Sequence, residues 1–72
     1  MDYVLVNFRY GELDEDLKIP AFITVGELIS ILCESFGVRG SSLHAEPRSI
    51  ILDKNKTAAE QGVEHGTILT LE

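Results

Sequence analysis

The chain has 72 residues and a mass of 8.0 kDa, so it can hold one domain, residues 1–72, with one compact core. Its formal net charge of −6, from twelve acidic and six basic side chains, argues against binding to nucleic acid or anionic lipid. No apolar run approaches the roughly 20 residues that span a bilayer, and the N-terminus lacks the pattern of a signal peptide. The single Cys33 excludes an internal disulfide. We therefore expect a soluble cytoplasmic protein without direct membrane insertion.

Two strands and a turn are predicted at the start of the chain. Strand-forming residues fill positions 3–8, and Gly11 marks the turn. A second alternating strand ends at Pro20, which cannot donate to a ladder. The apolar residues expected on the core face of this hairpin are Val4, Val6, Phe8, Leu13, Leu17 and Ile19. Glu12, Asp14, Glu15 and Asp16 resemble a cation site, but they lack a glycine-centred calcium loop, so we interpret them as solvated side chains.

A helix is predicted between Thr24 and Val38. Thr24 and Glu27 have capping-box spacing, in which the Thr24 hydroxyl accepts from the first turn and the Glu27 carboxylate reaches the Thr24 amide. Either Phe22 or Ile23 can act as the hydrophobic staple before this cap. Gly37 can end the helix in the left-handed conformation. The predicted buried face consists of Val25, Leu28, Leu32 and Phe36, and Cys33 is interpreted as a packing residue.

The second half of the chain predicts short elements. Residues 43–46 and 50–52 are expected to form two short paired strands around a turn at 47–49. Thr57 and Glu60 repeat the capping-box spacing and predict one helical turn, which Gly62 ends. Val63 should enter the core from a loop. The last strand, 67–71, should turn Leu69 and Leu71 inward.

This order predicts an α+β fold in which one helix packs diagonally across a mixed sheet of four to five strands. The helix gives a crossover long enough for the last strand to pair in parallel with the first. The expected architecture is the β-grasp arrangement of ubiquitin.

Part of the chain also matches a particular family within the ubiquitin-like superfamily. The matching residues are Leu17 to Phe22, the helix positions Val25, Leu28, Ile29, Leu32, Ser35 and Val38, and Gly66, Ile68, Leu69 and Leu71 near the end. In these residues the chain resembles the YukD/EsaB proteins of Gram-positive type VII secretion systems. The resemblance covers nearly the whole chain and departs at Gln61-Gly62-Val63, where the family often has an aromatic residue.

Two features that ubiquitin needs for its function are not found in these residues. A conjugated modifier or sulfur carrier needs a flexible tail ending in two glycines, whereas this sequence stops at Leu71-Glu72. The positions that correspond to the apolar recognition patch of ubiquitin fall near Glu46, Thr70 and Glu72, which are polar. Recognition by ordinary ubiquitin-binding domains is therefore not expected, because a shared fold does not imply a shared function.

Catalysis is not expected either, and the sequence predicts no catalytic, cofactor-binding or metal-binding residues. His44 and His65 are the only side chains that titrate near neutral pH in their unperturbed state. His65 is interpreted as a solvated loop residue and His44 as part of a thin strand with outward-facing neighbours. With Cys33, they are too few for a zinc site.

Protein–protein binding remains, and the helix offers a surface for it. Ile31 lies about 100° round the helical wheel from Leu32, away from Leu28, so we expect it to be partly exposed. With Phe22 and Ser35 it can form a partner surface or a weak self-association surface. The alternatives are a wide helix footprint on a small sheet and a scattered apolar residue.

The resemblance implies a non-catalytic accessory or adaptor of a type VII-like, WXG100 (ESAT-6-type) secretion system, binding secretion-system proteins in the cytoplasm and recruited to a membrane complex. Two alternatives remain open from the sequence. One is a modifier or sulfur carrier whose glycine tail is missing. The other is a domain of a larger membrane-anchored secretion component.

Overall fold

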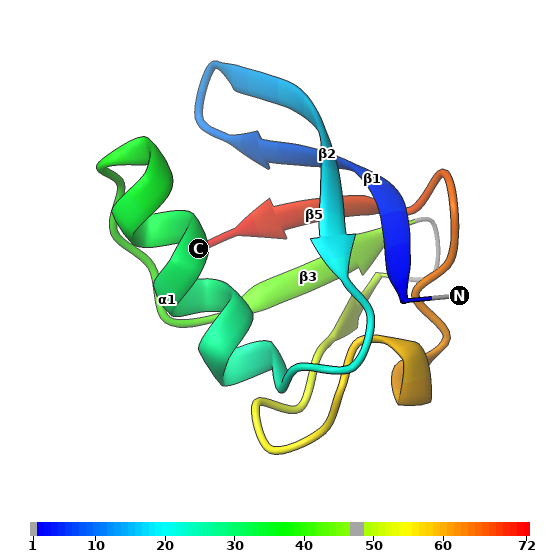
Figure 1. Cartoon of the computed structure of the whole chain (residues 1–72). Coiled ribbons are helices and arrows are strands. Elements are labelled where there is room, and N and C mark those ends of the chain that lie inside the picture. The colour runs from blue at the N-terminus through cyan, green and yellow to red at the C-terminus, as the bar shows by residue number, and fades with distance from the viewer. Residues whose placement is uncertain (1, 47–48) are drawn as a thin grey trace.

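The computed structural model describes residues 2–46 and 49–72 and shows a five-stranded mixed sheet with one helix against it (Figure 1). The strand order is β2-β1-β5-β3-β4. The α+β, ubiquitin-like β-grasp expected from the sequence is confirmed. The elements in chain order are β1 (Tyr3–Tyr10), β2 (Leu13–Pro20), α1 (Val25–Phe36), β3 (Leu43–Glu46), β4 (Ile50–Ile51), the 3₁₀ turn η1 (Ala59–Gln61) and β5 (Ile68–Leu71).

The strand β5 joins two hairpins into one sheet. β1 and β2 pair antiparallel along their whole length, from Tyr3 opposite Pro20 to Tyr10 opposite Leu13. β3 pairs antiparallel with β4 and with β5. β5 then lies parallel to β1, as the sequence predicts for strands separated by a helical crossover. The last strand in the sequence is therefore the central strand of the sheet.

Local side chains set both ends of α1. The Glu27 amide donates to the Thr24 hydroxyl over 3.2 Å, and Gly37 follows the helix with a φ of 64°. One detail of the predicted capping box is corrected, because the Glu27 carboxylate lies 3.3 Å from the Thr24 hydroxyl and not on the Thr24 amide. Ile23 packs against the core and Phe22 is exposed, so Ile23 takes the staple position.

The second half follows the prediction with smaller changes. β4 contains only Ile50 and Ile51, both exposed, while Leu52 is buried and donates its amide to the Leu43 carbonyl. Pro47 and Arg48 of the predicted turn lie outside the described residues. At the predicted helical turn, the Thr57 amide donates to Glu60 Oε1 and the Glu60 amide donates to the Thr57 hydroxyl, so this capping box is reciprocal.

The core lies between α1 and the covered face of the sheet. Phe8, Val25, Leu28, Leu43 and Leu69 are its largest fully buried side chains. Phe36 is partly buried, with its ring centroid 5.2 Å from that of Phe8. The predicted core residues Val4, Val6, Ile19, Leu32, Val63 and Leu71 are also buried, and Leu13, Leu17 and Cys33 pack against the core while partly exposed.

Candidate protein-interaction surfaces

The face of the sheet opposite α1 carries exposed apolar side chains. Along β1, Val4 and Val6 point into the core, so Tyr3 and Leu5 point the other way and are 37% and 50% exposed. An open groove of about 630 Å³ runs over this face, lined by residues that include Leu5 and Ile68. We call this side the helix-free face. Sequence reasoning missed its apolar residues, although Tyr3 and Leu5 occupy the opposite phase of the alternation that identified the core.

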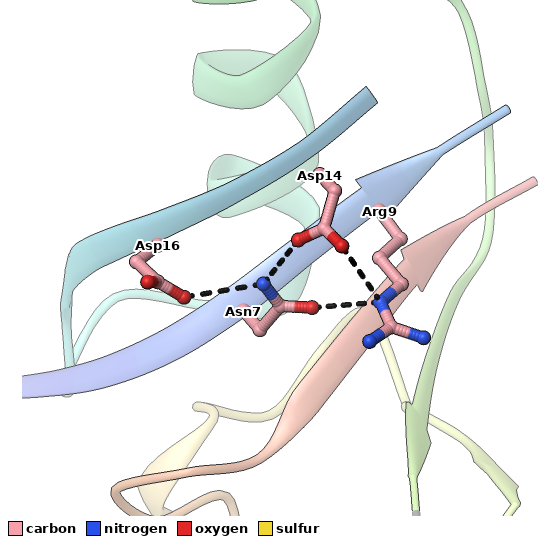
Figure 2. A network of polar contacts seen from close by, with 4 residues as sticks. All are labelled: Asn7, Arg9, Asp14 and Asp16. Atoms are coloured by element: carbon pink, nitrogen blue, oxygen red, sulfur yellow. Dashed lines mark hydrogen bonds and ion pairs between the residues drawn. The ribbon is translucent and has the colours of Figure 1, made fainter. Parts of the chain in front are cut away.

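A polar network fixes the charged side chains beside the groove (Figure 2). The Asn7 amide nitrogen donates to a carboxylate oxygen of Asp14 and, over 3.1 Å, to one of Asp16. Arg9 Nε donates to the Asn7 amide oxygen over 2.7 Å and lies 3.7 Å from Asp14 Oδ2. The residues alternate along β1 and β2 and face one another in register. Exposed pairs of this kind add little stability, but the network orients the two carboxylates.

A second cluster on the helix-free face contains Tyr3, Lys18 and His65. Lys18 Nζ lies 4.3 Å from the centroid of the Tyr3 ring, and the Tyr3 and His65 ring centroids are 6.1 Å apart. The Leu5 amide donates to His65 Nδ1 over 3.0 Å, which requires Nδ1 to carry no proton. His65 is an exposed loop residue, as the sequence predicts, and its imidazole also links the loop before β5 to β1.

The predicted helix surface, consisting of Phe22, Ile31 and Ser35, is accessible in the structure. Phe22 is 66% exposed, Ile31 is 44% exposed, and Ser35 is also exposed. Ile31 and Ser35 lie one turn apart in the second half of α1, whereas Phe22 belongs to the loop that precedes the helix. The structure thus brings two of the three residues to one place, and their role in binding stays a prediction.

The side chains considered for catalysis have separate partners. His44 Nε2 lies 3.2 Å from Glu72 Oε2, and Cys33 Sγ lies 3.9 Å from the Gly40 carbonyl oxygen. The neighbours of His44 in its strand, Leu43 and Ala45, are buried, which corrects the expectation that they face outward. Within residues 2–46 and 49–72, no three His, Cys, Asp or Glu side chains are placed to hold a metal ion. In the same ranges, no helix has the length and apolar character needed to cross a membrane.

The positions expected to replace the apolar patch of ubiquitin lie on β3, on β5 and directly after β5. Glu46 and Thr70 are partly exposed, and Glu72 is exposed. Thr70 lies opposite His44, and Glu46 lies opposite Ile68. The polar Glu46 therefore stands directly beside Ile68, which lines the groove.

Solved structures of ubiquitin-like proteins are similar to this fold. A ubiquitin-like domain from Arabidopsis thaliana has a TM-score of 0.83 at 13% identity, over 100% of this chain and 78% of that one. Caldiarchaeum subterraneum ubiquitin has a TM-score of 0.70 at 16% identity, with 97% and 94% covered. The ubiquitin-like domain of the Mycobacterium tuberculosis type VII secretion protein ECCD1 has a TM-score of 0.70 at 21% identity, with 99% and 98% covered. At these identities the likeness concerns the fold alone.

The family was identified at the level of sequence. No curated protein matched the chain. A sequence profile described as "WXG100 protein secretion system (Wss), protein YukD" matches residues 3–71, nearly the whole chain. The chain therefore belongs to the YukD family of the WXG100 protein secretion system.

Proposed function

We propose that residues 1–72 act as one non-catalytic ubiquitin-like domain, a cytoplasmic adaptor that binds proteins of a WXG100 secretion system. The match of residues 3–71 to the YukD profile carries this proposal. It is supported by the same fold in ECCD1, a type VII secretion protein, although that likeness concerns the fold only. Side chains such as Leu5 and Ile31 leave apolar area exposed on two sides of a small domain, as a protein-binding module requires.

The helix surface is the contact site that we propose for this adaptor. Ile31 is nearly half exposed in α1, and Ser35 extends its side of the helix by one turn. A lysine at position 31 would place a charge at the centre of this surface without entering the core. Ser30 is exposed in the same helix, so Ser30→Lys adds the same charge outside the proposed surface and serves as the matched control.

The test is complementation in the native host. The gene is deleted, the wild-type chain or a variant is restored, and the WXG100 protein in the culture medium is quantified. We expect deletion to lower secretion, the wild type and Ser30→Lys to restore it, and Ile31→Lys to restore less than about half. Unchanged secretion after deletion would contradict the adaptor role. Full restoration of secretion by Ile31→Lys would reject the helix surface as the contact site and leave the adaptor role standing.

Localisation is measured in the same strains. Immunoblots of cytosolic, membrane and medium fractions should find the chain in the cytosol, with a membrane-associated share that depends on the secretion complex. A chain recovered mainly from the medium would contradict a cytoplasmic adaptor.

A further inference from the structure

The strand β2 leaves one long edge of the sheet open. Within residues 2–46 and 49–72, β2 pairs with β1 and has no strand on its other side. It is eight residues long, whereas the opposite edge strand, β4, has two. An open edge of this length presents backbone donors and acceptors to which an extended segment of another chain can be added.

The hydrogen bonds of β1 identify which backbone groups of β2 are open. The Leu5 and Asn7 amides donate towards the segment that leads into β5, and the Leu5 carbonyl accepts from Gly66 on that side. The odd-numbered residues of β1 therefore face β5, and the even-numbered residues face β2. The β2 residues opposite these even-numbered residues are Leu13, Glu15, Leu17 and Ile19. Their backbone groups therefore form the hydrogen bonds between β2 and β1.

The remaining residues of β2 turn their backbone groups to the open edge. These are Asp14, Asp16 and Lys18, each with one amide and one carbonyl, and Pro20, which has a carbonyl only. The side chains of Asp14, Asp16 and Lys18 lie on the helix-free face, because these residues stand opposite Arg9, Asn7 and Leu5 of β1. On the other side of the strand, Leu13 and Leu17 are partly exposed and pack against the core.

The charges at this edge favour one kind of occupant. Asp14 and Asp16 are exposed carboxylates held in place by Asn7, with Arg9 close to Asp14. Cations on an added strand would stand directly opposite them, and an anion would stand opposite Lys18. A second copy of this chain is disfavoured because each copy carries a net charge of −6.

We propose that the β2 edge binds an extended segment of a protein partner, added antiparallel, in which apolar residues alternate with an anion and then two cations. The cations face Asp16 and Asp14, the anion faces Lys18, and the apolar residues lie beside Leu13 and Leu17. This inference gives the partner chemistry of the adaptor and in that sense rests on the proposed function. Its test uses the isolated chain and a synthetic peptide, so it can fail or succeed independently of secretion.

The probe is the peptide Val-Glu-Val-Lys-Val-Lys-Val with blocked ends, and the control has Lys and Glu exchanged. Binding to the ¹⁵N-labelled chain is followed by amide hydrogen exchange and chemical shifts. We expect the Asp14, Asp16 and Lys18 amides to exchange rapidly in the free chain and to become protected with the probe. The Leu13, Glu15 and Leu17 amides should be protected throughout. The charge-exchanged peptide should bind at least about tenfold more weakly than the probe. Added salt should weaken binding of the probe.

One pair of protein variants and one pair of N-methylated peptides separate backbone pairing from charge. Asp16→Pro removes one outward amide without removing a bond to β1, whereas Asp16→Ala removes the same carboxylate and keeps the amide. We expect Asp16→Pro to weaken binding about tenfold relative to Asp16→Ala. If Asp16→Pro fails to fold, N-methylated forms of the peptide test the same backbone pairing on the wild-type chain. N-methylation of its Lys and Glu residues should abolish binding, and N-methylation of its Val residues should not.

Three results would overturn the proposal. One is equal binding of the two peptides, which would remove the charge selection. Another is equal binding by the two N-methylated peptides, which would remove strand addition. The third is protection of the Asp14, Asp16 and Lys18 amides on raising the protein concentration without peptide, which would make a second copy the occupant.

Discussion

Gly40 lies where the loop after α1 passes the last strand, and no larger residue fits there without displacement. A Cβ at position 40 would stand 2.5 Å from Leu71 Cγ, 2.8 Å from Leu71 Cδ1 and 2.9 Å from the Glu72 carbonyl oxygen. The Ser41 and Ser42 amides donate to that same carbonyl oxygen, over 2.8 and 3.0 Å. The loop and the strand are thus held together by backbone bonds that leave no room for a methyl group.

We predict that Gly40→Ala lowers the free energy of unfolding by about 1–3 kcal/mol, the usual cost of overpacking. Urea denaturation followed by circular dichroism measures it. Ser41→Ala is the control, because Ser41 contributes its backbone amide and its side chain is exposed, so its effect should stay within about 0.5 kcal/mol. Equal stability of both variants would show that Leu71 moves aside freely.

Some single-residue contacts lie beyond the reach of sequence reasoning. Leu5 and His65 are bonded although 60 positions separate them, and no local pattern links an amide in one strand to an imidazole in a distant loop. By contrast, the exposure of Ile31 follows from helical periodicity alone, and the structure agrees with it.

At the scale of elements, capped ends were more predictable than strand ends. The helix α1 begins after Thr24 and ends before Gly37, and both ends could be predicted because the capping groups are chemical features of nearby residues. A strand ends where its partner ends. β1 continues to Tyr10, two residues beyond the prediction, because Leu13 stands opposite Tyr10. In the same way β4 stops at Ile51 while Leu52 turns into the core.

The capping box at η1 should make stability depend on pH. The Thr57 amide, followed by the Thr57 hydroxyl, lowers the pKa of the Glu60 carboxyl from its ordinary value of 4.5, and Lys56 adds a smaller effect in the same direction. Glu60 therefore contributes stability above pH 4.5, and this contribution is lost as the pH falls through the lowered pKa of the folded state.

We accordingly predict that Glu60→Gln is less stable than the wild type at pH 7 and that the difference shrinks below pH 4.5. Urea denaturation at several pH values measures both. A difference that stays constant from pH 7 down through the acid range would show that the ionised carboxylate has no part in the cap.

At the scale of the whole molecule, the fold could be predicted from the order of the elements, but the position of the open edge could not. A hairpin, a helix, a second hairpin and a final strand define the β-grasp, because few arrangements bury the apolar face of each. The alternation in residues 13–20 predicts a strand with one buried face, and this pattern is the same for a central strand and for an edge strand. Only the strand order shows that β2 is at the edge.

One core also predicts one cooperative unit. Leu69 is fully buried and stands between Phe8 and Ala45 in the two hairpins that flank β5. We predict that Leu69→Ala lowers the free energy of unfolding by about 2–5 kcal/mol. This is a large share of the roughly 5–15 kcal/mol by which a folded domain is typically stable. Amide exchange should then accelerate in both hairpins together.

The control for this prediction is Ile51→Ala, which removes an exposed side chain from β4 and should change stability by less than about 0.5 kcal/mol. Faster exchange confined to one hairpin in Leu69→Ala would show that the hairpins unfold independently.

The central place of β5 also constrains how the chain folds during its synthesis. Before residues 68–71 leave the ribosome, the β1–β2 and β3–β4 hairpins have no strand between them. An isolated two-stranded hairpin is at best marginally stable in water. The sheet therefore cannot be completed, and apolar residues of both hairpins stay accessible to chaperones, until nearly the whole chain shown in Figure 1 has been translated.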